Sequence, residues 1–149
     1  MMMIEPYEAI GPLHFGMDQN DVVAAMGEPQ RITKSRRRNI LLWYGDVNVT
    51  MEADKLVEVG FGPAAPVSIH GIHPFTDQGA FDSLCRLDGN PCKVLGFIVF
   101  RNLGITLTGF HDKDESQKAL TAFARGRWDV LEPQMKPYSL QATGPASRS

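Results

Sequence analysis

Residues 13–29 carry the signals of a complete short helix, and they constrain the fold more than any other stretch. Asp18 predicts the N-cap, because its carboxylate can accept the unpaired backbone N–H groups of the first turn. Val22 and Met26 follow at helical spacing, and a Gly-x-Pro sequence ends the segment. Since so short a helix is marginal on its own, we expect it to pack against the rest of the chain.

Alternating apolar residues after this helix predict an antiparallel meander. Strands are expected at residues 30–34, 40–44, 47–51 and 56–61, separated by short turns. The Gly- and Pro-rich residues 62–66 then form the clearest linker in the chain.

A fainter copy of this unit begins near Phe75. Thr76 or Asp77 can cap a second helix whose apolar face is Phe81, Leu84 and Cys85, and a second Gly-x-Pro ends it. More strands are expected at 94–100 and 103–110, a third helix at 115–124, and a buried extended segment at Trp128, Val130 and Leu131. Internal similarity of this kind favours a tandem repeat, and chance similarity of two helix–meander units is the alternative.

The expected fold is therefore α+β. Two tandem helix–antiparallel-meander units form one sheet, with the helices on one face. Residues 1–66 make the first repeat, residues 67–132 make the second, and residues 133–149 form a flexible tail rich in Pro, Ser, Gly and Ala.

The motif F-G-M-x-x-x-x-V-x-x-x-x-G-x-P at residues 15–29, followed by a meander, resembles the helix–strand unit of two groups. One is the SmpA/OmlA-type family of small outer-membrane assembly lipoproteins. The other is the beta-lactamase inhibitor protein type, which carries the unit twice. The resemblance implies a sheet with one face left open for docking. It also implies a small bacterial binding or immunity protein.

Composition excludes several classes of function. The net charge of −2 argues against a nucleic-acid footprint spread over the chain. The first residues, MMMIEPYEAIG, contain neither a basic region nor a long apolar run, so we expect no signal peptide and no membrane anchor. Two cysteines do not make a disulfide framework, and the cytoplasm is the expected compartment.

The segment between Lys34 and Asn39 is the sharpest local feature, because it places Arg36, Arg37 and Arg38 side by side. Arginine forks suit carboxylates or phosphates on a partner, and an acidic protein surface is the expected one. A solvated hairpin tip is the alternative interpretation. Trp43 and Tyr44 follow in the next strand, so they should lie on opposite faces, with the outward ring serving as an interface anchor. The alternative is that the outward ring covers sheet surface under a loop.

The remaining candidate groups give weak chemical signals. His70 and His73 stand three apart, so a strand would point them to opposite faces and a metal site would need a turn. Cys85 falls on the apolar face of the second helix, which predicts a buried, inert thiol, and Cys92 is expected to be buried too. We therefore expect no catalytic residues, no metal and no cofactor.

The function predicted from the sequence is non-catalytic protein binding. A toxin-immunity or enzyme-inhibitor protein that occludes its partner fits best, with contacts from the arginine segment, Trp43 and Tyr44. Neither nucleic acid nor membrane is an expected partner. The alternative is an enzyme or small-ligand binder with a pocket between the repeats, lined by His70, His73 or Cys85.

Overall fold

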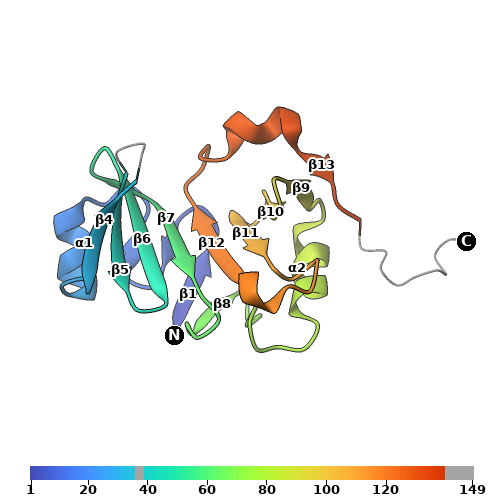
Figure 1. The fold of residues 1–149 in the computed structure, drawn as a ribbon, viewed down its shortest axis with the longest axis horizontal. Coiled ribbons are helices and arrows are strands. Elements are labelled where there is room, and N and C mark those ends of the chain that lie inside the picture. Colours follow the sequence, from blue (N-terminus) through green and yellow to red (C-terminus); the bar gives the residue numbers. More distant parts are fainter. Residues whose placement is uncertain (36–38, 140–149) are drawn as a thin grey trace, which may run out of the picture.

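The computed structural model describes residues 1–35 and 39–139, whose strands form two sheets (Figure 1). The large sheet contains β4 (Arg31–Lys34), β5 (Ile40–Tyr44), β6 (Val47–Glu52), β7 (Lys55–Phe61), β9 (Cys92–Val94), β10 (Phe97–Phe100), β11 (Ile105–Thr108), β12 (Ala119–Phe123) and β13 (Lys136–Pro137). The small sheet contains β1 (Met2–Glu5), β2 (Ala9–Ile10), β3 (Leu13–His14) and β8 (Val67–Ile69). The helices are α1 (Gln19–Met26) and α2 (Ala80–Asp88), with short 3-10 helices η1 (Glu115–Gln117) and η2 (Asp129–Gln134). The fold is α+β.

Helix α1 lies where the sequence predicts it. The Asp18 carboxylate accepts the backbone N–H of Asp21 at 2.8 Å, and the Asp21 carboxylate accepts the N–H of Asp18 at 3.4 Å. At the other end, the N–H of Gly27 donates to the carbonyl of Val23 at 2.8 Å. Local capping therefore fixes both ends of this helix.

Each helix is followed by an antiparallel meander. Strands β4 to β7 follow α1, strands β9 to β12 follow α2, and the two meanders meet where β7 pairs with β12. The large sheet has the order β13-β9-β10-β11-β12-β7-β6-β5-β4. The prediction that all strands form one sheet is wrong, because β3-β2-β1-β8 form a separate sheet held by parallel pairing of β1 with β8.

One face of the large sheet packs against both helices and the small sheet. A single apolar cluster joins Val22 of α1 and Leu84 of α2 to strand residues of both sheets. Its fully buried strand residues include Ile10, Leu13, Leu42, Val49, Val59, Ile105 and Leu107. Burial of this shared core is the main favourable term that holds the layers together.

Over the second meander, the opposite face of the large sheet is covered by the segment that follows β12. There Val94, Val99 and Phe123 form a second cluster, against which Trp128 and Leu131 pack. This cover is η2, which arches from β12 to β13 in Figure 1. The prediction of a buried extended segment here is wrong, because the segment is a 3-10 helix and Val130 is 78% exposed.

Other predicted elements also differ from the structure. The helix predicted at 115–124 is wrong, since η1 ends at Gln117 and β12 follows as an inner strand of the large sheet. Helix α2 begins at Ala80 rather than near Thr76, after Gly79 at the N-cap position without a side-chain cap.

The described part of the predicted flexible tail is docked. Strand β13 pairs with β9, and the Tyr138 ring packs against Phe81 with centroids 5.9 Å apart. Residues 140–149 lie outside the described residues. Among the helices of residues 1–35 and 39–139, none has the length and apolar character needed to cross a membrane.

Candidate functional site

Trp43 and Tyr44 lie on opposite faces of β5, as their alternation predicts. The Tyr44 ring packs against the main core, and its hydroxyl donates to the carbonyl of Gly27 at 2.8 Å, beside the end of α1. Trp43 points to the other face and is partly exposed. Tyr44 is also partly exposed, so what distinguishes Trp43 is its position on the face away from the main core.

Neighbouring side chains hold the Trp43 ring in place. Its indole N–H donates to Thr33 Oγ1 at 2.9 Å. The guanidinium carbon of Arg31 lies 4.4 Å from the ring centroid, which is cation–π geometry. The indole therefore has little rotamer freedom left to lose when a partner binds.

A shallow depression of about 220 Å³ lies beside this ring. Strand pairing places Trp43, Asn48, Gly60 and Thr121 in one row across β5, β6, β7 and β12. We call the surface formed by these four residues the hollow face. It crosses the junction between the two meanders.

Gly60 keeps the hollow face concave. A Cβ atom at Gly60 would lie 2.9 Å from Asn48 Oδ1, so the Asn48 side chain lies flat across this strand only because the glycine has no side chain. The same holds at Gly62, where a Cβ atom would lie 2.6 Å from Asp46 Oδ2. That Asp46 oxygen accepts the backbone N–H of Ala64 at 2.8 Å, and this hydrogen bond holds the segment after β7 in place at the edge of the depression.

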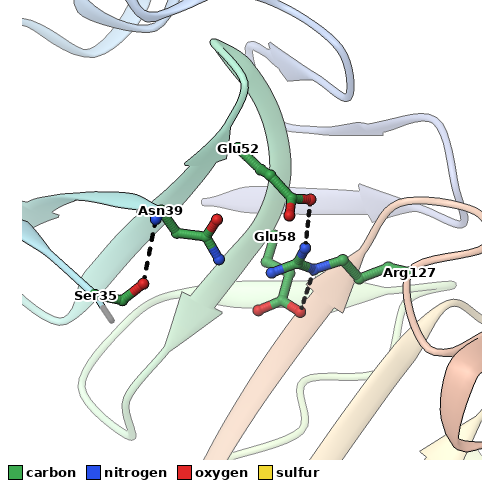
Figure 2. A network of polar contacts seen from close by, with 5 residues as sticks. All are labelled: Ser35, Asn39, Glu52, Glu58 and Arg127. Carbon is green, nitrogen blue, oxygen red and sulfur yellow. Dashed lines mark hydrogen bonds and ion pairs between the residues drawn. The ribbon is translucent and has the colours of Figure 1, made fainter. Parts of the chain in front are cut away.

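A polar network lies on the same side of the large sheet as the hollow face. Figure 2 shows its residues, beside the turn that joins β4 to β5. Arg127 donates from Nε to Glu58 at 3.0 Å and from Nη1 to Glu52 at 2.7 Å. The Arg127 side chain is 20% exposed, so these bonds are partly shielded from water. Arg127 thus links the segment after β12 to β6 and β7, which belong to the first meander.

Asn39 stands beside this network at the start of β5. It is 7% exposed, its N–H donates to Ser35 Oγ at 3.2 Å, and Figure 2 shows its side chain pointing toward Glu58. Its Oδ1 atom is buried and accepts no hydrogen bond from the described residues. Arg36, Arg37 and Arg38, which the sequence predicts as partner-binding residues, lie outside the described residues.

The two histidines predicted as weak metal candidates, His70 and His73, have different surroundings. His70 is exposed in a left-handed conformation with φ of 50°. His73 Nδ1 lies 3.3 Å from Asp77 Oδ2, and the hydrogen bond from the backbone N–H of His73 lowers the pKa of Asp77. Within the described residues, no three His, Cys, Asp or Glu side chains are placed to hold a metal ion.

Cys85 is buried on the core side of α2, as predicted, and Cys92 is buried as well. Desolvation, reinforced by the charges of Asp82 and Asp88, raises the pKa of the Cys85 thiol to about 12. We expect iodoacetamide at pH 8 to leave Cys85 unmodified in the folded protein and to modify it in guanidinium, because the thiolate is the nucleophile. Peptide mapping by mass spectrometry checks this result, and rapid labelling of Cys85 in the native state would contradict it.

Several residues of this region carry no recognisable signal in the sequence. Arg31 could be placed opposite Trp43 only by fixing the register of the β4–β5 hairpin. Asn48 and Thr121 lie on different meanders, and Arg127 reaches Glu58 across a sequence separation of 69 residues. Only the three-dimensional fold brings these groups together.

Comparison of the chain with protein-family models, with curated proteins and with solved structures finds no match.

Proposed function

We propose that this protein is a non-catalytic protein-binding module that docks an acidic segment of a partner on its hollow face. The observation that carries this proposal is the Trp43 ring, which is partly exposed and held between Arg31 and Thr33 beside a concave, uncovered part of the sheet. Trp and Arg are the residue types most enriched at the energetic centres of protein interfaces.

Charge favours an acidic partner. Arg31 and Lys34 are exposed on β4, at the edge of the large sheet. The sequence adds Arg36, Arg37 and Arg38 after Ser35. Such a cluster attracts carboxylates and speeds encounter more than it adds to affinity. The same charges disfavour antiparallel pairing of β4 with its own copy, because like charges would meet across the strands.

The fixed position of the Trp43 ring in the free protein should raise the affinity for a partner. Binding normally costs about 0.5–1.5 kcal/mol for each side chain that loses rotamer freedom. Trp43 has already lost this freedom in the free protein, since Thr33 and Arg31 hold its two sides. A partner side chain entering the depression would contact a rigid wall formed by the indole.

We further propose that the chain is built from two tandem helix–meander units. The resemblance of residues 15–29 to the beta-lactamase inhibitor protein type supports an enzyme or toxin as the partner. On this proposal the partner's own site is blocked by occlusion. The meander pair joined at β7 and β12 provides a continuous surface for such a contact.

The test compares Trp43→Ala with the wild-type protein in binding to a partner captured from the source cells and then purified. We expect Trp43→Ala to weaken affinity by about 100-fold, the size of a loss of about 2–3 kcal/mol at an interface hot spot. The matched control is Leu87→Ala, which removes a 46%-exposed apolar side chain from α2. Calorimetry on the purified pair gives both affinities.

Equal affinities for wild type and Trp43→Ala would place the interface elsewhere and overturn the proposed site. Failure to capture any stoichiometric partner, together with a melting temperature raised by a metabolite, would favour the small-ligand alternative.

Raising the salt concentration should slow association of the wild-type pair, because exposed charges are screened within about 10 Å at 0.1 M.

A further inference from the structure

A second depression, of about 450 Å³, lies away from the hollow face and has a largely polar lining. It forms where four segments meet: the β1–β2 turn, the segment before β9, the segment after β10 and the segment after β12. The side chains that line it are Tyr7, Asn90, Arg101, Asn102, Arg125 and Asp129.

A buried carboxylate fixes one wall of this pocket. Asp88 is 4% exposed, and its Oδ1 accepts the backbone N–H groups of Asn102 at 2.8 Å and Leu103 at 3.2 Å. Its Oδ2 accepts the N–H of Asn90 at 3.1 Å. The backbone on both sides of the depression is therefore held in place before any ligand arrives.

Tyr7 fixes the second wall. Its hydroxyl donates to the carbonyl of Arg101, and its ring packs edge-on against Phe123 with centroids 5.7 Å apart. The guanidinium carbon of Arg125 lies 4.2 Å from the Tyr7 ring centroid. Stacking on this ring orients Arg125 without using its N–H donors.

The arginines of this pocket retain donors for a ligand. Within residues 1–35 and 39–139, no carboxylate forms an ion pair with Arg125. Arg101 pairs with Glu132 through Nη2 alone, at 3.1 Å, and both side chains are more than a third exposed. Such a surface pair contributes little and can be exchanged for a better acceptor.

We propose that this pocket binds a small phosphorylated polyol, such as a sugar phosphate. Arg101 and Arg125 would hold the phosphate, since guanidinium forks match its oxygens. Asn90 and Asp129 would bind the hydroxyl groups. Asn102 would accept through Oδ1, because its Nδ2 already donates to the carbonyl of Asp88 at 2.7 Å. The volume lies within the usual range of small-molecule sites, and the Tyr7 ring is the main apolar surface of the lining. This proposal is independent of the protein-binding function proposed above.

The test is calorimetric titration of the full chain with glucose 6-phosphate, inorganic phosphate and glucose at constant ionic strength. We expect glucose 6-phosphate to bind at least about tenfold more tightly than phosphate, and glucose to give no heat. Arg125→Gln and Arg101→Gln should each weaken glucose 6-phosphate binding about tenfold or more, as expected for losing a charged hydrogen bond.

Arg86→Gln is the matched control, because Arg86 is an exposed arginine of α2 outside the pocket lining. It should bind like the wild type. Melting curves of every variant separate loss of the site from loss of the fold. Binding of glucose 6-phosphate no tighter than phosphate would indicate an adventitious ion only and overturn the proposal. Undiminished binding in both arginine variants, or no binding at all by the folded wild type, would overturn it as well.

Discussion

Replacing Asp88 with alanine is expected to destabilise the protein by about 3 kcal/mol, because three backbone N–H groups lose their hydrogen-bond acceptor. The N–H groups of Asn90, Asn102 and Leu103 all donate to this carboxylate, and Leu103 is itself buried. Losing the carboxylate also frees the turn between β10 and β11. Chemical denaturation of wild type and Asp88→Ala measures the difference.

Asp88→Asn is the matched control for this substitution. A carboxamide oxygen can still accept from Asn102 and Leu103, whereas its NH₂ group would face the N–H of Asn90. We therefore expect Asp88→Asn to lose less stability than Asp88→Ala. If both variants matched the wild type, the three hydrogen bonds would contribute nothing to stability.

The raised pKa of Asp88 also leads us to expect that the stability of the protein depends on pH. Burial raises its pKa above the ordinary value of 3.8, and the three N–H donors only partly offset this effect. The native state thus holds the proton to higher pH than the unfolded state does. The resulting stabilisation is fully present below pH 3.8 and is lost as the pH rises through the raised pKa. Asp88→Asn should remove this contribution from the stability–pH curve.

Replacing Gly109 with alanine is expected to cost at least about 3 kcal/mol, which is the other large effect. Gly109 has φ of +81°, where side chains are disfavoured. A Cβ atom there would lie 2.5 Å from the backbone nitrogen of Lys118 and 2.7 Å from the carbonyl oxygen of Asp114. Because both contacts are backbone atoms, η1 and the start of β12 would have to move. Thermal and denaturant unfolding measure the loss.

Gly126→Ala separates the two causes of this loss. Gly126 has a similar φ of +85°, but the nearest atom to a Cβ there is Asp129 Oδ2 at 3.8 Å. The Gly126→Ala variant should lose only the part of the stability that comes from the unfavourable φ, about 1 kcal/mol in the free energy of unfolding. Equal losses at the two positions would show that the backbone around Gly109 yields without cost.

The elements that the sequence predicts correctly are those fixed by local signals. Helix α1 has its capping pair and its glycine within the segment itself, so residues 13–29 suffice to place it. Strand β6 alternates apolar and polar residues, β5 is a short apolar run, and a tight turn joins the two strands. The opposite orientation of Trp43 and Tyr44 follows because successive side chains of a strand point to opposite faces.

The elements that the sequence misplaces depend on distant partners. Leu120 and Ala122 suit a strand as well as a helix, and pairing with β7 and β11 decides for the strand. The small sheet needs β1 to pair with β8, which lies far along the chain and carries no local mark of that pairing. The second pocket is equally invisible, since Tyr7 meets Arg101 across a separation of 94 residues.

The junction of β7 with β12 has a consequence for assembly. Four antiparallel residue pairs join the two meanders there, and residues 62–66 are the only covalent connection that runs from β7 toward the second meander. If the β7–β12 and β1–β8 pairs break while residues 62–66 extend, each meander presents a bare strand edge that fits the complementary edge of another molecule. Two chains can then exchange their second halves and restore every pair in a domain-swapped dimer. Concentrated refolding, rather than native purification, is the condition that would populate this dimer.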